Sequence, residues 1–282
     1  MAEDYVPPEV WTWDREGQTG FRGNRPIAGA THEHELPRGK HPFQLYSLGS
    51  PNGQKVSILF EELLAAGYTG AEYDAWLISI MDGDQFGSGF VSVNPNSKIP
   101  ALLDLSGPEP IRFFESAAIL LHLAEKFGAF IPTDAKGRAE CLSWLFWQMS
   151  NAPSMGGGFG HFYKMAPVKI EYAINRYAME AKRIFDVADR HLAEHRYFAG
   201  DAYSIADIAV FTWFRYFQRA NAYDGGTKFL DTPGYLNVAR WIDEIDAREP
   251  VRRGLRVNLT GDGNVRERHS AADIDAVLAA QV

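Results

Sequence analysis

Residues 94–116 read NPNSKIPALLDLSGPEPIRFFES, and this stretch decides the fold. Two apolar runs flank a turn that contains glycine and proline, which predicts a β-hairpin. Helical spacing starts directly after it, at Ser116. A serine at a helix N-terminus suits a carboxylate, because its hydroxyl and the free backbone N–H groups can donate hydrogen bonds. Glu115 beside it suits an ammonium group. This junction is therefore either an ordinary capped helix or a site for the amino-acid end of a small peptide.

A strand and a helix are expected before the hairpin. Residues 43–47 alternate between apolar and polar, and apolar residues then recur at helical spacing from Val56 to Leu64. Ser50 followed by Pro51 is a typical N-cap and first-turn pair, so the positive end of this helix lies beside the end of the strand. With a second strand over 71–78 and a helix over 116–127, residues 41–128 are expected to form an α/β unit.

The second half of the chain is predicted to be helical. A break in period at 128–134 predicts a linker, and residues 135–258 are expected to form an all-α unit. Ser204 and Asp207 have the spacing of a capping box and are given a structural role. Long helical patterns cover 135–153, 168–195, 204–219 and 234–247.

Both ends of the chain are polar and lack a sustained period. Residues 1–40 are expected to be an arm that packs in part on the body, because Trp11 and Trp13 are costly to leave in water. Residues 259–282 are expected to be a tail that lies on the surface.

Composition excludes several classes of protein. The 282 residues are 46% hydrophobic, which is enough for the core of one or two domains. A net charge of −8 argues against nucleic acid or an anionic membrane as the main partner. The single cysteine, Cys141, rules out an internal disulfide framework and fits a cytoplasmic protein. No run approaches the roughly 20 apolar residues that span a bilayer, and residues 1–25 lack a signal-type apolar run.

Other candidates for chemistry are weaker. Ser50 has no nearby histidine or aspartate that would suggest a hydrolase triad, although triad partners can be distant in sequence. Cys141 lies in an apolar helical stretch and is expected to be a buried, non-catalytic thiol. The run 156–160, GGGFG, lacks the ending of a phosphate-binding loop and is expected to break a helix. The histidines lack the spacing of metal ligands, so no metal is expected.

The motif from Asn94 to Leu102, together with Phe114-Glu115-Ser116, resembles the glutathione site of the cytosolic glutathione transferases. The resemblance extends over about residues 10–258 and implies a thioredoxin-like domain followed by an all-helical domain. Its details are most similar to the bacterial nu-class members, which are glutathione-dependent disulfide-bond oxidoreductases. The fragments that carry this closer match lie at 10–13, 24–26, 51–55, 82–86 and 156–163.

The resemblance assigns roles to individual residues. Ser50 and Asn52 are expected to donate hydrogen bonds to the sulfur of glutathione, Ile99 to pair with its cysteinyl part before a cis Pro100, and Glu115 and Ser116 to hold its γ-glutamyl end. Tyr163 and Tyr223 are candidates for the wall of the electrophile pocket. The glutathione-binding set implied by the resemblance is Asn24, Ser50, Pro51, Asn52, Gln85, Lys98, Ile99, Glu115, Ser116 and Arg176.

The implied reaction is reduction of small disulfides by two glutathiones, which act as co-substrate, with organic hydroperoxide reduction as a further activity. The alternatives are conjugation or thioether cleavage of aromatic substrates, and a non-catalytic glutathione-binding or scaffold protein. The expected partners are glutathione, a small disulfide or electrophile, and a second copy of the chain.

One position departs from the family pattern. A glutamine is expected on the first helix of the helical domain, and Gln148 lies one place earlier than that alignment. One residue rotates a helix by about 100°. Met149 is therefore an alternative occupant of the position on the glutathione side.

Overall fold

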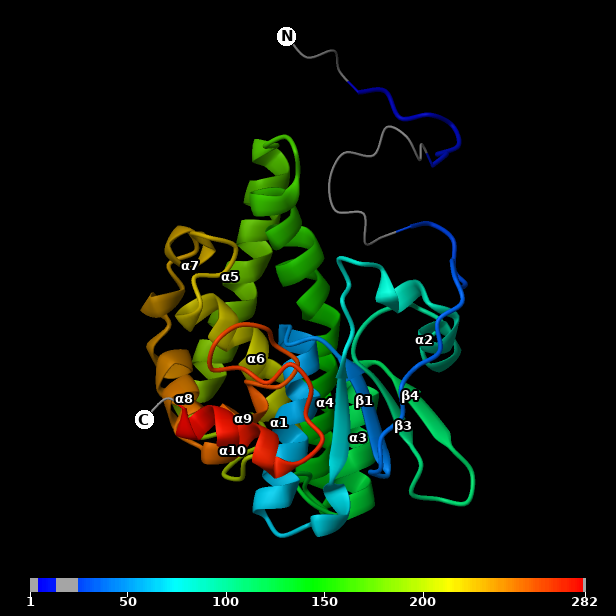
Figure 1. The fold of residues 1–282 in the computed structure, drawn as a ribbon. Helices are drawn as coiled ribbons and strands as arrows, with labels where there is room; N and C mark the ends of the chain where they lie inside the picture. The colour runs from blue at the N-terminus through cyan, green and yellow to red at the C-terminus, as the bar shows by residue number, and fades with distance from the viewer. Residues whose placement is uncertain (1–4, 14–24, 281–282) are drawn as a thin grey trace.

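The computed structural model describes residues 5–13 and 25–280. Within this part of the chain, a mixed sheet in the order β2-β1-β3-β4 carries helices on both faces (Figure 1). Strand β1 is parallel to β2 and antiparallel to β3, and β3 pairs with β4 as the predicted hairpin. The strands are β1 (Phe43–Ser47), β2 (Tyr73–Leu77), β3 (Ala101–Asp104) and β4 (Ile111–Phe114).

The helices of the first half cover the sheet. Phe43 and Leu45 of β1 pack into the large core with α1 and α3, and Tyr46, which points to the other face, packs against α2. This alternation follows from the period of two along a strand. The elements are α1 (Pro51–Ala65), η1 (Thr69–Ala71), η2 (Asp84–Phe86), α2 (Ser88–Val93) and α3 (Ser116–Phe127).

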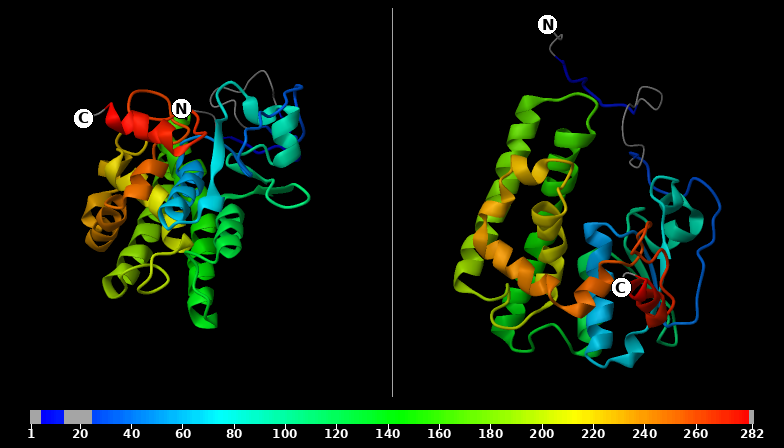
Figure 2. Two further views of the ribbon diagram at one scale, coloured as in Figure 1. Left: turned by 60° about the horizontal axis from the view of Figure 1, so that its bottom comes forward. Right: turned by 60° about the vertical axis from the view of Figure 1, so that its left-hand side comes forward.

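The second half is helical, and Figure 2 shows residues 135–246 as a separate layer beside the sheet. Helix α6 is buried along most of its length and packs against α1 and α4. The predicted capping box is present: Asp207 Oδ2 accepts from the Ser204 N–H at 3.0 Å. The elements are α4 (Ala135–Pro153), η3 (Ser154–Met165), α5 (Glu171–Glu194), α6 (Ile205–Arg219), α7 (Gly226–Phe229), η4 (Thr232–Gly234), α8 (Leu236–Asp246), α9 (Glu249–Gly254) and α10 (Ala271–Ala279).

The prediction that the glycine run at 156–160 breaks a helix is wrong. Chain from Ser154 to Met165 continues α4 as a wide π-helical segment. A Cβ at Gly158 would lie 2.3 Å from the ring of Tyr177, and one at Gly160 would lie 2.2 Å from Tyr223. The glycines therefore let aromatic rings pack directly on the backbone, which is a structural role.

The two ends of the chain differ from expectation in part. Residues 31–34 of the arm make backbone hydrogen bonds with residues 86–89, but Trp11 is 62% exposed and so is not covered. Residues 259–280 lie mostly on the surface, but Val265, Arg268 and Ile274 are buried and anchor the segment. Arg268 is completely buried, and it binds Glu61 of α1 and Glu72, while its backbone pairs with Ala75 of β2.

The same C-terminal segment supports the turn between β1 and α1. The Gly49 N–H donates to the carbonyl of Asn258 at 2.8 Å, and a Cβ at Gly49 would lie 2.3 Å from the side chain of Leu259. The segment that follows α9 is therefore in direct contact with the turn that carries Ser50.

Candidate active site

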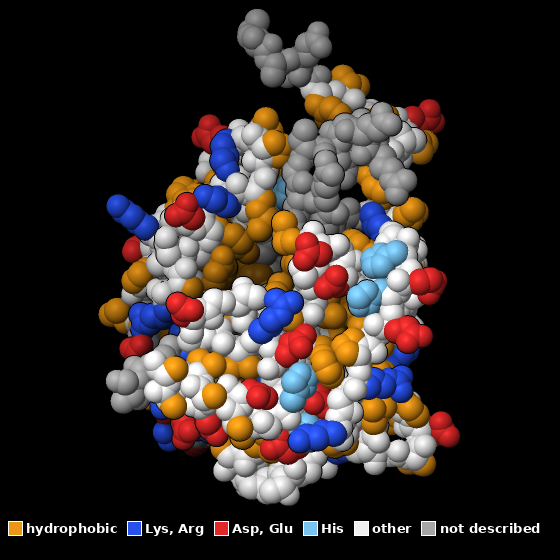
Figure 3. Space-filling model, viewed as in Figure 1, with side chains coloured by type: hydrophobic (Ala, Val, Ile, Leu, Met, Phe, Trp, Pro, Cys, Tyr) orange, Lys and Arg blue, Asp and Glu red, His pale blue; other side chains and the backbone are white. Residues whose placement is uncertain are grey.

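A cleft of about 480 Å³ opens at the N-terminal end of α1, between the sheet and the helical layer. Its volume is within the range of small-molecule sites. Figure 3 shows a hollow with hydrophobic walls on this face of the molecule. Nine of the residues predicted from the sequence line the cleft: Ser50, Pro51, Asn52, Gln85, Lys98, Ile99, Glu115, Ser116 and Tyr223.

Ser50 caps α1 as predicted. Its Oγ accepts from the Gly53 N–H at 3.4 Å, and Pro51 occupies the first turn. A Cβ at position 53 would lie 1.9 Å from the carbonyl oxygen of Leu48, so this tight turn requires glycine. Because the cap uses Ser50 Oγ as an acceptor, its hydroxyl hydrogen stays available as a donor.

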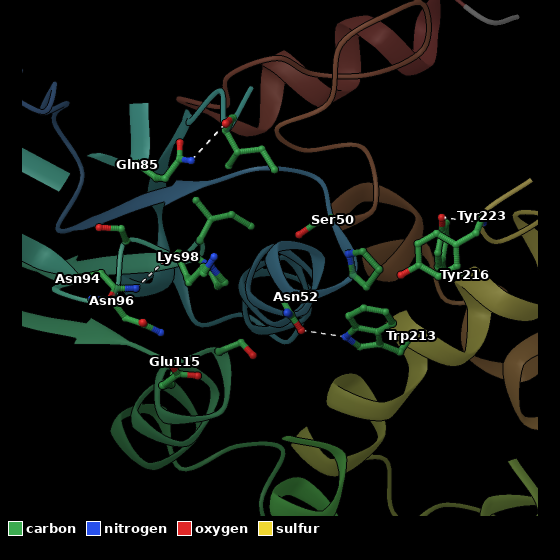
Figure 4. Close-up of a pocket in the computed structure, with 16 residues that line it drawn as sticks. Ser50, Asn52, Gln85, Asn94, Asn96, Lys98, Glu115, Trp213, Tyr216 and Tyr223 are labelled. Carbon is green, nitrogen blue, oxygen red and sulfur yellow. Dashed lines mark hydrogen bonds between the residues drawn. The ribbon is translucent and has the colours of Figure 1, made fainter. Parts of the chain in front are cut away.

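Asn52 stands at the centre of the site (Figure 4). Its Oδ1 accepts from Lys55 Nζ and from Trp213 Nε1, each at 2.9 Å. The Trp213 indole comes from α6, so this hydrogen bond joins the helical layer to the first turn of α1. The helix N-terminus adds a positive potential at this point.

The junction between β4 and α3 presents the predicted pair of groups, a carboxylate that suits an ammonium and a helix N-terminus that suits a carboxylate. Glu115 is exposed and has φ +68°, a region that side-chain-bearing residues rarely adopt. Such backbone strain is typical of functional sites. Ser116 is the first residue of α3 and is 6% exposed, with Oγ 3.6 Å from Met149 Sδ.

The opposite wall carries amide and backbone groups. Gln85 is 3% exposed and lines the cleft; its Nε2 donates to the Ile80 carbonyl at 3.2 Å, while Oε1 has no hydrogen-bond partner among the described residues. The Ile99–Pro100 bond is cis, as the resemblance implies. Burial lowers the pKa of Lys98, which lies on the rim.

Three predicted residues are not among those lining the cleft. Asn24 lies outside the described residues. Arg176 is on α5 and forms an ion pair with Glu180. Tyr163 is on η3, where its ring stacks on Phe159. Their contact with a ligand stays a prediction.

Gln148 and Met149 both lie near the site, but their side chains have different surroundings. Gln148 is 2% exposed, and its Oε1 accepts from Lys55 Nζ at 2.7 Å, beneath the cleft. Met149 lines a second hollow of about 340 Å³ that shares Asn52, Glu115 and Trp213 with the cleft. Met149 therefore lines a hollow beside the cleft, whereas Gln148 contacts Lys55 in the core; which of the two faces glutathione stays a prediction.

Several functional candidates were missed by sequence reasoning. Trp213 and Tyr216 of α6 form the aromatic wall, and burial raises the pKa of Tyr223 beside them. Lys55 was not singled out. A lysine in the second turn of a helix and a tryptophan in a buried helix are ordinary patterns, and no local signal separates these two from core or surface residues. Ile80 also lines the cleft and was not predicted, and four residues of the predicted 94–102 motif that had no binding role of their own line it as well: Asn94, Asn96, Ser97 and Pro100.

The described residues were also searched for metal ligands, membrane-spanning helices and a reactive cysteine. No group of three histidine, cysteine or carboxylate side chains gathers as metal ligands in residues 5–13 and 25–280. No helix in the same residues has the length and hydropathy needed to cross a membrane. Cys141 is completely buried in α4, and burial raises the pKa of its thiol.

Comparison with known proteins identifies the family. The model of the glutathione S-transferase C-terminal domain matches residues 171–244. The disulfide-bond oxidoreductase YghU of Escherichia coli is 58% identical over 96% of this chain and 95% of its own. A structure of glutathione transferase YghU from Streptococcus pneumoniae, complexed with glutathione, has a TM-score of 0.88 at 55% identity, covering 91% of this chain and 98% of that one.

A more distant structure agrees. The glutathione transferase from Pseudomonas putida, with one glutathione disulfide bound per subunit, has a TM-score of 0.70 at 38% identity, covering 77% of this chain and 93% of that one. The sheet order, the cis Ile99–Pro100 bond and the cleft at the start of α1 are consistent with these likenesses. The chain, with its thioredoxin-like and all-helical halves, belongs to the glutathione transferase family.

Proposed function

We propose that this protein is a glutathione-dependent disulfide-bond oxidoreductase of the nu class, which uses two glutathiones to reduce a small disulfide. One observation carries the proposal. The two hydrogen-bond donors at the start of α1, Ser50 and Asn52, line the same cleft as Glu115 and Ser116, which suit the ammonium and the carboxylate of an amino-acid group. The relatives named as disulfide-bond oxidoreductases and the glutathione-bound structures support it.

The start of α1 suits a thiolate. An ordinary thiol has a pKa of about 8.5, and it is lowered at a helix N-terminus. The Ser50 hydroxyl and the Asn52 amide would add two hydrogen bonds to the ionised sulfur, and bonds to a charged group are the stronger ones. Free glutathione is mostly protonated at neutral pH, so this stabilisation raises the concentration of the attacking species.

The two ends of glutathione find opposite partners. The γ-glutamyl end carries an ammonium and a carboxylate, which suit the Glu115 carboxylate and the Ser116 hydroxyl with the N-terminus of α3. The unpartnered Gln85 Oε1 is a further acceptor for an N–H group. Ile99 and Lys98 are proposed to bind the cysteinyl and glycyl parts.

The exchange needs no protein cysteine. One glutathione thiolate attacks a sulfur of the disulfide, which breaks the S–S bond and releases a product thiolate. A second attacks the glutathione sulfur of the mixed disulfide and releases glutathione disulfide and the second product thiolate. The two glutathiones supply both electrons, and the two protons that they lose end on the products. Cys141 is enclosed in the core and takes no part.

Three substrate classes test the proposal. We expect saturable turnover of a small dialkyl disulfide, measured as glutathione disulfide, with weaker turnover of an aryl halide or an organic hydroperoxide. Calorimetry of glutathione binding is the control for an intact site. Tight binding without turnover of any of the three would favour a binding protein, and turnover of the aryl halide alone would favour a conjugating transferase.

We also propose a cytoplasmic homodimer, with domains at residues 41–128 and 135–258. Apolar side chains on the outside of the molecule support the dimer, since Phe146 of α4 is 56% exposed and Met179 of α5 is 60% exposed. A buried, unpaired cysteine fits a reducing compartment. Light scattering should give twice the chain mass of 31.5 kDa. A species of 31.5 kDa alone at micromolar concentration would contradict the dimer.

A further inference from the structure

Lys55 lies in the second turn of α1 and is completely buried beneath the cleft. Its Nζ donates to Gln148 Oε1 at 2.7 Å, to Asn52 Oδ1 at 2.9 Å and to Ser116 Oγ at 3.4 Å. An ammonium has three donors and no acceptor, so three oxygens from three helices match its charged form. Burying an ammonium without such partners would cost a large amount of folding free energy, so these three oxygens are what allows a charged lysine at this position.

The network determines which way the Asn52 amide faces. Its Oδ1 accepts from both Lys55 Nζ and Trp213 Nε1. The indole N–H and the ammonium are donors only. The amide oxygen therefore points toward the core, and the amide NH₂ is the group left to face the cleft (Figure 4).

Few other charges act on Lys55. Burial lowers the pKa of Lys55 well below its ordinary value, and the nearby Glu115 carboxylate offsets only part of this effect. Helix α4 contributes the neutral Gln148, and α6 contributes the neutral Trp213. The three oxygens around Nζ are the observation that favours the charged form, and Nζ lies beside Asn52 of the first turn, where a thiolate is proposed to bind.

We infer that Lys55 is a positioning residue for the glutathione thiolate: it holds the Asn52 amide with its NH₂ toward the cleft, and it places a buried positive charge beneath the sulfur. This role rests on the proposed function, because it concerns glutathione in the same cleft. Lys55 acts through Asn52 and through its field and does not touch the reacting atoms.

The test compares Lys55→Met with the double variant Lys55→Met/Gln148→Met. The single variant leaves the buried Gln148 amide without its donor and should lower the free energy of unfolding, whereas the double variant removes both polar partners and should recover much of it. The pKa of bound glutathione is read from thiolate absorbance against pH. It should rise by about one unit or more in both variants, because a unit charge acts strongly over this short range in a protein interior.

The pH profile of kcat/KM for a small disulfide should move in the same direction, with a loss of about tenfold at neutral pH. Lys182→Met is the matched control, since Lys182 Nζ also donates a hydrogen bond, to the Leu230 carbonyl, but lies outside the cleft. It should leave the thiol pKa unchanged. A wild-type thiol pKa in the folded double variant would overturn the role of Lys55.

This outcome is distinct from failure of the proposed function. If wild-type protein binds glutathione with a lowered thiol pKa but reduces no disulfide, the proposed reaction is wrong and Lys55 is still tested by the absorbance titration. If wild-type protein does not lower the thiol pKa at all, there is no stabilised thiolate for Lys55 to position, and the inference is wrong as well.

Discussion

Changing Asn52 to aspartate separates its hydrogen-bond donor from its structural role. In the wild-type protein, Lys55 Nζ and Trp213 Nε1 each lie 2.9 Å from the Asn52 amide oxygen. In Asn52→Asp, one carboxylate oxygen can still accept both hydrogen bonds. The NH₂ that faces the cleft becomes an oxygen with no proton. A lost hydrogen bond to a charged group is worth about 1.5–3 kcal/mol. Repulsion between carboxylate and thiolate adds to this, and the adjacent Lys55 ammonium offsets part of it.

Together these three effects should destabilise the bound thiolate by at least about 2 kcal/mol. This corresponds to a rise of about 1.5 units in the pKa of the glutathione thiol and to a loss of about 30-fold in kcat/KM. The assay is thiolate absorbance of the glutathione complex against pH, beside urea unfolding, which should show near wild-type stability. Asn151→Asp is the control, because Asn151 lies on α4 outside the cleft. An unchanged thiol pKa in a folded Asn52→Asp protein that binds glutathione would refute the donor role.

Three further outcomes follow from the site and its surroundings. Glu115→Ala and Ser116→Ala should each weaken glutathione binding by roughly tenfold or more in calorimetry, because each removes a hydrogen bond to a charged end of the ligand; equal affinity would place the γ-glutamyl end elsewhere. Cys141→Ala should keep disulfide turnover and lose about 1 kcal/mol of stability by urea unfolding, and loss of turnover in folded protein would implicate the cysteine. Burial raises the pKa of Asp74, but donors that include the His41 N–H and His269 lower it on balance. This carboxylate therefore stabilises the fold above its ordinary pKa of about 3.9 and loses that effect as pH falls further, so the deficit of Asp74→Asn in urea unfolding should shrink between pH 6 and pH 3; a constant deficit would contradict the shift.

Local patterns were enough for the order of the elements. The hairpin at 101–114, the cap at Ser50 and the start of α6 at Ser204 depend on residues close together in sequence, so they could be read directly. The last segment could not. Arg268 reads as a surface charge in a polar stretch, and its burial depends on Glu61 and Glu72, which lie about 200 residues earlier.

The residues of the site likewise fall into those that the sequence could predict and those that it could not. Glu115 and Ser116 could be predicted because their motif is contiguous. Trp213 could not, because its importance comes from a hydrogen bond to a residue 161 positions away. Gln148 was one place from the expected position, and only the packing of α4 shows that its side chain contacts Lys55 while Met149 lines a hollow beside the cleft.

The contact of Asn258 and Leu259 with Gly49 has a consequence for how the protein is made. The strand and helix that hold Ser50 leave the ribosome early, but the Gly49 N–H finds its carbonyl partner only after some 210 more residues have been synthesised. Until then the turn lacks both this hydrogen bond and the leucine side chain that covers it. A nascent chain that stops at residue 254, the end of α9, would contain every residue that lines the cleft and would still lack these contacts to the turn that carries Ser50. The contacts that hold this turn are therefore completed late in translation, well after strands β1 to β4 have been synthesised.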